Sequence, residues 1–415
     1  MMSSDLRLNP FTDLILNEGE CRLIAPRPGY GLTFLSIPRG EYPDLYDLVI
    51  DLSRLRLDFL DIENDLNDSD RNLLYENGIL VEEDKSPQKP MFACQLDDVV
   101  LVDIENVEAS SLIVNPTFHF DSVNLSNFNS YAQGKNLLPY QSVAWIKTIG
   151  SDIEIGFWVD ENEAEIISGF EAGQKASSNI GKDLLGKLVN TEILISPKDI
   201  RRKQAKYIEE IGRIQKSFKE NSYATLPSIL PDHQMNAMKT YYRDYVKNGF
   251  MPFADYQVKK RYYQHNEPLA MFLHGNLNKL MSLVVGESVK PSYVFAASYV
   301  EDAVLTPHVD RTQCEFSFSF QIDYLPESEN HISPWALFVD KPETPIDPEI
   351  GYKSNEFPAK TQADDQNNAV FLANGDALAY KGCELVHYRY PLPKGHKSTS
   401  LFFHYVPVDF EGELD

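Results

Sequence analysis

Two histidines and one aspartate have the residue types and spacing of a metal site. His308 and Asp310 form a His-x-Asp pair, and His387 lies closer to the C-terminal end of the sequence. Two imidazoles and one carboxylate are the ligands of a facial triad, which leaves coordination positions of a non-haem Fe(II) open for other molecules. The three residues therefore predict an iron site of this kind.

Short strand-like segments, punctuated by Gly and Pro, surround these residues. Within a β-strand, side chains two residues apart point to the same face, so His308 and Asp310 can converge on one ion. His387 lies in another such segment, and strands that pack face to face would bring it to the pair. The pattern favours an all-β sandwich or barrel. Its segments are Tyr293–Tyr299, Glu315–Ile322, Ala336–Val339, Ala369–Leu372, Ala377–Tyr380, Glu384–Tyr388 and Ser398–Val406.

Three helical stretches precede these strands. Residues 199–221 are rich in charge and carry a stripe of isoleucines, which is typical of an amphipathic helix. Residues 231–248 begin with a proline, and residues 267–286 carry leucines at helical spacing. We interpret all three as support helices that pack on the sheet. Among the strands, the Pro-, Asp- and Glu-rich segment 341–366 is either a lid or surface decoration.

The N-terminal half has the pattern of small mixed helix-and-strand units. A hairpin is predicted within residues 21–35, two helices within 46–78, and a strand at 79–81. This order resembles a winged-helix unit. A similar order at residues 144–195 indicates either a diverged duplication or two unrelated α+β stretches. We therefore expect an α+β protein with a first domain at 1–110, a second unit at 111–200, and the support helices with the β domain at 201–415.

Composition narrows the classes of partner and the compartment. The formal net charge of -24, with a sequence pI of about 4.8, argues against nucleic acid and anionic membranes, because phosphate binding needs clustered Lys and Arg. No uninterrupted apolar stretch approaches the roughly 18 residues of a membrane span, and the N-terminus lacks an export pattern. The four cysteines have no metal-binding spacing. We expect a soluble, cytoplasmic protein with reduced thiols.

Two further residues stand where an oxoacid cosubstrate would need them. If an oxoacid chelates the iron through its keto and adjacent carboxylate oxygens, its far carboxylate needs a cation deeper in the barrel. Lys397 stands ten residues after His387 and meets that need. Tyr299, nine residues before His308, is in a position to add a phenolic hydrogen bond to the same carboxylate.

With these residues the C-terminal part resembles the Fe(II)/2-oxoglutarate-dependent dioxygenases, and within them the prolyl-4-hydroxylase-like branch. The resemblance covers about Tyr262 to Asp409 and implies a double-stranded β-helix, or jelly roll. One departure is the turn at residues 300–303, where the family has a glycine. The family order of Tyr, His-x-Asp, distal His and a basic residue ten positions later is matched by Tyr299, His308-Val309-Asp310, His387 and Lys397.

The resemblance implies that Fe(II) binds to the triad and that 2-oxoglutarate and O2 are cosubstrates. The implied reaction hydroxylates an unactivated C–H bond and releases succinate and CO2. The superfamily's halogenating members carry a small residue in place of Asp310, so hydroxylation is favoured. We expect an amino-acid side chain as substrate, free or in a peptide or protein, with the N-terminal half either docking it or supporting the barrel. The alternatives are a hydroxylase of a small non-amino-acid metabolite, a nucleic-acid demethylase, which the charge disfavours, and a non-catalytic jelly-roll binding or scaffold protein.

Two arginines are candidates for contact with the substrate. Arg311 follows the His-x-Asp pair directly, and Arg389 shares the strand parity of His387. Each would bind a substrate carboxylate or form a structural salt bridge. His404 is a poor alternative for the distal ligand, because no basic residue stands ten positions after it, and His331 is predicted to lie in a loop.

Overall fold

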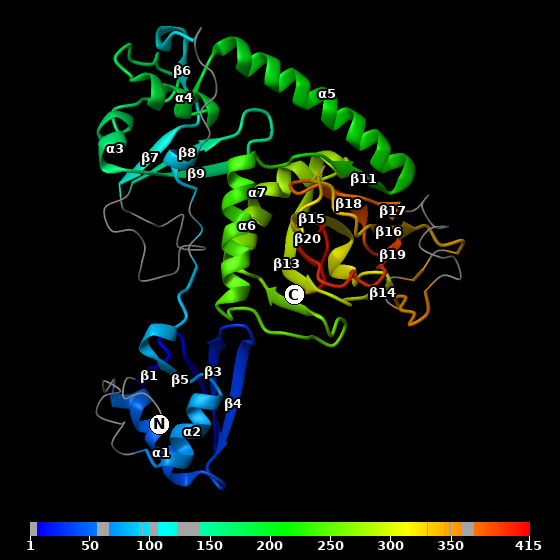
Figure 1. The fold of residues 1–415 in the computed structure, drawn as a ribbon. Coiled ribbons are helices and arrows are strands. Elements are labelled where there is room, and N and C mark those ends of the chain that lie inside the picture. Colours follow the sequence, from blue (N-terminus) through cyan, green and yellow to red (C-terminus); the bar gives the residue numbers. More distant parts are fainter. Residues whose placement is uncertain are drawn as a thin grey trace. The chain divides into compact units, whose positions relative to one another are not determined.

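The computed structural model of the chain describes residues 6–55, 66–90, 92, 94–99, 107–122, 142–329, 331–344, 346–347, 350–357 and 369–415. It is an α+β protein whose described strands pair in antiparallel sheets (Figure 1). Contacts divide it into two units, residues 1–90 with 242–264 and residues 91–241 with 265–415. The predicted division into three parts differs from this one, because residues 91–200 fall in the same unit as the C-terminal strands. The three-domain division stays a prediction. Among the described helices, none is long and apolar enough to cross a membrane.

The first unit begins with an antiparallel meander of β2 (Asp13–Asn17), β3 (Glu20–Arg27) and β4 (Gly31–Pro38). Helices α1 (Pro43–Leu55) and α2 (Asp68–Glu76) follow, and β5 (Leu80–Glu82) pairs with β1 (Leu6–Leu8). Asn67 begins α2 by accepting the backbone N–H of Asp70 through its side chain. Because the three-stranded meander precedes both helices, this arrangement does not support the predicted winged-helix unit.

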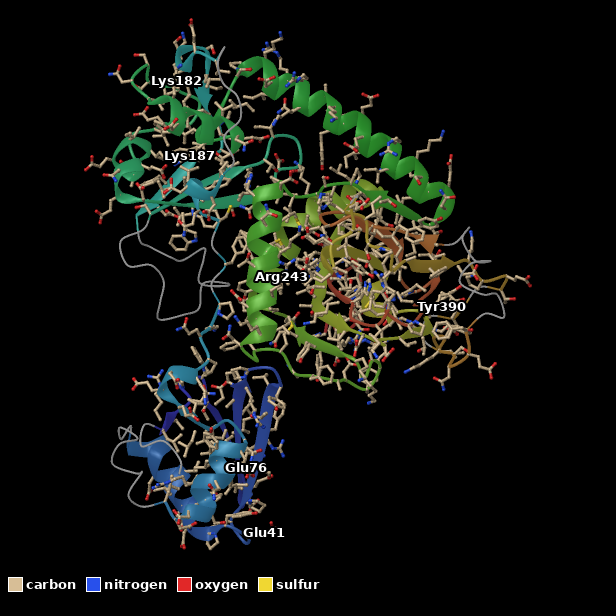
Figure 2. The ribbon with its side chains drawn as sticks, viewed as in Figure 1. Glu41, Glu76, Lys182, Lys187, Arg243 and Tyr390 are labelled. Carbon is tan, nitrogen blue, oxygen red and sulfur yellow. The ribbon has the colours of Figure 1, made fainter. Side chains whose placement is uncertain are left out.

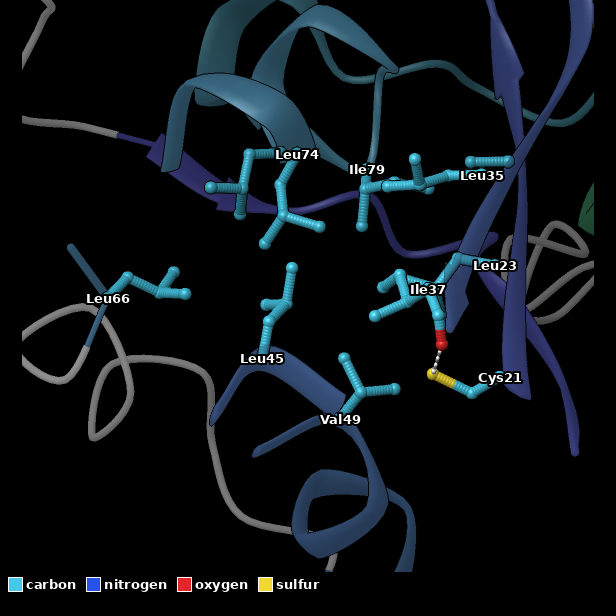
Figure 3. Close-up of a cluster of buried hydrophobic side chains, with 11 residues drawn as sticks. Cys21, Leu23, Leu35, Ile37, Leu45, Val49, Leu66, Leu74 and Ile79 are labelled. Carbon is cyan, nitrogen blue, oxygen red and sulfur yellow. Dashed lines mark hydrogen bonds between the residues drawn. The ribbon is translucent and has the colours of Figure 1, made fainter. Parts of the chain in front are cut away.

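The core of this unit lies between the meander and the two helices (Figure 3). Leu45 and Val49 stand four residues apart on α1 and therefore share one face of the helix. They meet Leu74 of α2 and the alternate, inward-facing residues of β3 and β4, which include Leu23 and Ile37. Burial of these side chains stabilises the unit by about 1.5–3 kcal/mol for each large one.

The second unit begins with a matching series of elements. Strands β7 (His119–Ser122), β8 (Ser142–Lys147) and β9 (Glu154–Val159) form an antiparallel sheet, followed by α3 (Glu161–Ile167) and α4 (Lys182–Asn190). Strand β10 (Leu194–Ile195) then pairs with β6 (Ile113–Val114). The order and the pairing of strands, with the last strand returning to the first, are those of the first series.

A buried asparagine occupies the equivalent place in each series. Asn9 and Asn115 both precede a proline, and each donates its side-chain amide to two backbone carbonyls. Each also accepts, through Oδ1, the backbone N–H of the residue two positions later. This shared Asn-Pro pair is a repeated identity between the two series. The carbonyl acceptors are Pro26 and Gly78 for Asn9, and Lys147 and Glu192 for Asn115.

The three predicted support helices are α5 (Pro197–Asn221), α6 (Asp232–Lys247) and α7 (Pro268–Val285). Ser196 and Glu267 cap the first and third by accepting backbone N–H groups, and a proline stands at the start of each. Both helices end at a left-handed residue, Ser222 and Gly286. The boundaries between the two units fall within α6 and within β12 (Arg261–His265).

The C-terminal part is built on two antiparallel sheets. One contains β11 (Tyr223–Leu226), β18 (Ala377–Lys381), β15 (Phe316–Leu325), β20 (Lys397–Pro407) and β13 (Val289–Val300), in that order. The other has the order β14 (Leu305–His308), β19 (Val386–Arg389), β16 (Leu337–Asp340) and β17 (Ala369–Val370). The sheets contact each other through side chains, since the ring centroids of Tyr380 on β18 and His387 on β19 are 5.0 Å apart.

Candidate metal centre

The predicted triad assembles where β14 ends against β19. His308 is the last residue of β14 and pairs in register with His387, which brings residues distant in sequence side by side. Asp310 follows the strand, and its backbone N–H donates to the carbonyl of Gly382 at 2.9 Å. The imidazole ring centroids are 4.3 Å apart, and one potential ligand atom from each of the three residues lies within 4.8 Å of the others. This spacing suits a single ion.

Both imidazoles present the same nitrogen to the centre. The Nδ1 of His308 donates to the carbonyl of Thr306 at 2.8 Å, and the Nδ1 of His387 donates to that of Leu385 at 3.0 Å. Because a carbonyl only accepts, each Nδ1 carries a proton, and Nε2 is the nitrogen that offers a lone pair to an ion when the ring is neutral. The two Nε2 atoms lie 3.8 and 3.4 Å from Oδ1 of Asp310.

Electrostatics keep the carboxylate of the centre ionised. Burial alone would raise the pKa of Asp310, but the surrounding imidazoles of His387, His404 and His308 outweigh it and hold that pKa well below its ordinary value. Burial likewise acts to lower the pKa of His387, and the charge and hydrogen bonding of Asp310 overcome it and raise the pKa above 6.5. The centre therefore attracts a cation, which competes with the proton on His387.

Arg389, two residues after His387, is the second notable group. Its side chain is buried, lies 4.5 Å from the ring of Trp335, and donates from Nη1 to the backbone carbonyl of Trp335. Its Nε has no hydrogen-bond partner, and no described carboxylate forms an ion pair with the guanidinium. Burial lowers its pKa to about 10, an effect that neighbouring tyrosines including Tyr299 partly offset. A carboxylate ligand would satisfy this cation.

Trp335 is itself held in place beside the arginine. Its indole N–H donates to the carbonyl of Tyr390 at 2.7 Å, and Tyr390 directly follows β19. Figure 2 labels Tyr390 in the C-terminal part of the chain. Tyr299 packs edge-on to the Trp335 ring, with centroids 5.1 Å apart. Arg389, Tyr299 and Trp335 thus form one buried group, which we call the arginine cluster.

Lys397 lies away from the arginine cluster. Along the pairing of β13 with β20, Tyr299 is opposite Ser398, and Val300 is opposite Lys397. Tyr299 and Ser398 are buried, whereas Lys397 is exposed. Since neighbouring residues of a strand point to opposite faces, Lys397 lies on the face opposite to that of Tyr299. The structure brings Tyr299 together with Arg389 and not with Lys397.

The remaining candidates lie close to His308 and Asp310 in the chain or across β14. Arg311 is exposed, with its guanidinium carbon 5.0 Å from the ring of Tyr293. Part of the predicted lid lies outside the described residues, but residues 350–357 are described. There Tyr352 accepts the backbone N–H of Val309 at 3.1 Å, and Ser354 donates to the carbonyl of Pro307 at 2.9 Å. This part of the segment runs along β14 beside His308.

Sequence reasoning missed the groups that surround the carboxylate of Asp310. The Oγ of Ser317 lies 3.3 Å from its Oδ2 and 2.8 Å from Nδ1 of His404. Gly382 leaves space for it, because a Cβ there would come within 2.5 Å of Oδ2. Only the pairing of β15 with β20 brings Ser317 opposite His404, so no local pattern predicts this contact.

The residues present fit both Fe(II) and 2-oxoglutarate. Two neutral imidazole nitrogens with one ionised carboxylate form a donor set that suits Fe(II). The unpaired, buried N–H of Arg389 suits a dicarboxylate with one end at the metal.

Solved structures of other proteins are similar to about half of this chain. No protein-family model matches the chain, and no curated protein does. Among solved structures, a Pseudomonas putida prolyl-4-hydroxylase is similar over 48% of this chain and 98% of its own, at 12% identity and a TM-score of 0.34. A 2OG-Fe(II) oxygenase family oxidoreductase from Burkholderia pseudomallei covers 47% of this chain and 89% of its own, at 12% identity and 0.34. A Trichoplax adhaerens prolyl hydroxylase is similar over 48% of this chain and 89% of its own, at 8% identity and a TM-score of 0.35.

Proposed function

We propose that this chain is an Fe(II)/2-oxoglutarate-dependent oxygenase with His308, Asp310 and His387 as its iron ligands. One observation carries the proposal: both Nε2 atoms face the same oxygen of Asp310, at 3.8 and 3.4 Å, while each Nδ1 is tied to a backbone carbonyl. Hydrogen bonds of this kind orient metal-ligating histidines and select their tautomer. The ligands are therefore oriented before an ion binds.

The proposal extends to the scaffold, which we infer to be a double-stranded β-helix. Two antiparallel sheets support this inference, because Tyr380 of one sheet packs against the metal-site residue His387 of the other. The sheet of β14 and β19 supplies both histidines and Arg389. The sheet of β13 and β18 supplies Tyr299 and Tyr380.

A bound Fe(II) supplies the redox chemistry that couples decarboxylation of 2-oxoglutarate to oxidation of a substrate C–H bond. The chain's own residues supply binding and orientation. Asp310 and the two imidazoles hold the ion, and Arg389 binds the far carboxylate of 2-oxoglutarate, with its partnerless Nε–H as one donor. Trp335 and Tyr299 pack around that arginine and exclude water, which strengthens the charged hydrogen bond.

We further propose that the substrate is an amino-acid side chain, free or within a peptide or protein. Arg311 is exposed one residue after Asp310 and offers a cation to a substrate carboxylate. Residues 352–354 run beside His308 and are near enough to the triad to contact a bound substrate. The N-terminal series remains our proposed docking region for a peptide or protein, since its meander exposes Ile15 and Phe34.

The test measures succinate formed from 2-oxoglutarate by the Fe(II)-loaded protein. We expect the wild-type chain to form succinate and His308→Ala to form none, because the substitution removes an ion ligand. His331→Asn is the matched control: it also removes a histidine, but an exposed one whose positive φ asparagine tolerates. Equal turnover by His308→Ala and His331→Asn would refute the proposal.

The substrate is tested separately, by incubating the active protein with amino acids and peptides and searching for products heavier by one oxygen atom. We expect such products from amino-acid or peptide substrates. Oxidation of small non-amino-acid metabolites only would refute the substrate proposal and leave the reaction class standing.

A further inference from the structure

The carboxylate of Asp310 has two oxygens in different surroundings. Oδ1 faces the Nε2 atoms of His308 and His387, the side on which the proposed ion binds. Oδ2 points the other way, where Ser317 Oγ lies 3.3 Å from it. A carboxylate that binds an ion through one oxygen needs a donor on the other to stay in that orientation.

Ser317 is in turn held by His404. The two residues are directly opposite each other in the pairing of β15 with β20, and Ser317 Oγ lies 2.8 Å from Nδ1 of His404. Both side chains are buried. The serine has one hydroxyl proton, so it donates to Asp310 only when Nδ1 of His404 carries a proton and donates to Oγ.

The position of Asp310 is also shaped by steric contact. Its backbone N–H donates to the carbonyl of Gly382, and any side chain at that glycine would meet Oδ2 within 2.5 Å. The carboxylate thus lies between the bare Cα of Gly382 and the hydroxyl of Ser317. Two independent features of the chain, one a missing side chain and one a hydrogen bond, place the same oxygen.

We propose that His404 and Ser317 are positioning residues that donate in series, from Nδ1 of His404 to Oγ of Ser317 and from Oγ to Oδ2 of Asp310, and so hold Asp310 to bind the metal through Oδ1 alone. This inference rests on the proposed function, because it assigns a role to residues that touch a proposed iron ligand. It also assigns a role to His404, a buried histidine that is not one of the proposed iron ligands.

The test measures the affinity of the metal-free, full-length protein for Co(II), followed by the visible absorption of the bound ion. We expect Ser317→Ala to weaken binding by about 10- to 100-fold, the effect typical of losing a partner of a metal ligand, and to change the Co(II) spectrum. Ser319→Ala is the matched control. Ser319 lies two residues along β15, is equally buried, and its hydroxyl has no hydrogen-bond partner, so we expect wild-type affinity.

Variants of His404 test the order of the two donors. We expect His404→Phe to weaken Co(II) binding about as much as Ser317→Ala, and the double variant to lose no more than either single one, because both break one chain. His404→Asn supplies an N–H near the position of Nδ1 and should recover most of the affinity. Thermal unfolding of the metal-free variants identifies any that do not fold, and Ser317→Ala then carries the test alone.

The outcomes separate this inference from the proposed function. Equal Co(II) affinity and spectra for Ser317→Ala and Ser319→Ala would overturn the donor series, and so would additive losses in the double variant. The proposed iron site stands in either case if Co(II) binding is lost in Asp310→Ala. If Asp310→Ala binds Co(II) as wild type does, the proposed iron site itself is wrong, and the inference falls with it.

Discussion

Replacing Arg389 with methionine should weaken 2-oxoglutarate binding far more than the same replacement at Lys397. Arg389 is buried, its Nε has no partner, and Trp335 and Tyr299 pack around it. Methionine fills similar length without charge or N–H groups. Lys397 is exposed on the opposite face of β20 from Ser398, so its loss touches nothing in the arginine cluster.

The size of the effect follows from the hydrogen bond that is lost. A hydrogen bond to a charged group contributes about 1.5–3 kcal/mol, and more where water is excluded. Since about 1.4 kcal/mol is a factor of ten, Arg389→Met should raise the KM for 2-oxoglutarate by roughly 10- to 150-fold. If the contact is the same in the ground and transition states, kcat changes little. Lys397→Met should leave both constants near their wild-type values.

The assay is succinate formation at saturating Fe(II) over a range of 2-oxoglutarate concentrations. Direct binding of 2-oxoglutarate to Ni(II)-loaded protein checks that the change lies in affinity. Thermal unfolding of each variant checks that it is folded. A large rise in KM for Lys397→Met together with a normal KM for Arg389→Met would refute the assignment, and with it the inference from burial and strand parity.

Two further predictions concern pH and the N-terminal series. Because the pKa of His387 is raised in the fold without a bound ion, its protonated form stabilises the fold below pH about 6.5, and this contribution is lost as pH rises through the raised pKa. Asp310→Asn should remove this contribution and lower the His387 pKa, measured by NMR titration. An unchanged pKa would contradict the role of Asp310. Asn115→Ala should lower the free energy of unfolding by about 1–3 kcal/mol, because two backbone carbonyls lose their donor, as measured by urea denaturation against an exposed control, Asn179→Ala. Equal stability of the two variants would show that the buried asparagine does not hold its series together.

In the N-terminal half, the order of helices and strands was predictable from the sequence, but the pairing of the strands was not. The two series were predictable as short strands and helices, because turns and helical spacing are local signals. Their common topology was not, because the return of β5 to β1 and of β10 to β6 is long-range pairing. The shared Asn-Pro pair was visible in the sequence, but it gained meaning only once each asparagine was seen to join two distant backbone segments.

The sequence by itself determined the triad and the elements around it. His308, Asp310 and His387 were predictable because their chemistry is rare and the segments around them have strand periodicity. The spans of α5 and α7 were also predictable to within two residues, since the helical spacing of their apolar residues is a local feature.

Only the tertiary structure pointed to Arg389 as the proposed anchor for 2-oxoglutarate and to Ser317 as a partner of the Asp310 carboxylate. A spacing of ten residues pointed to Lys397, but a strand's faces alternate with every residue, and the register with β13 turns Lys397 outward and Ser398 inward. Arg389 became a candidate anchor through burial without a partner, which is a property of packing. Ser317 and His404 meet because two strands pair, and no pattern along one strand encodes which residue will face it across a sheet.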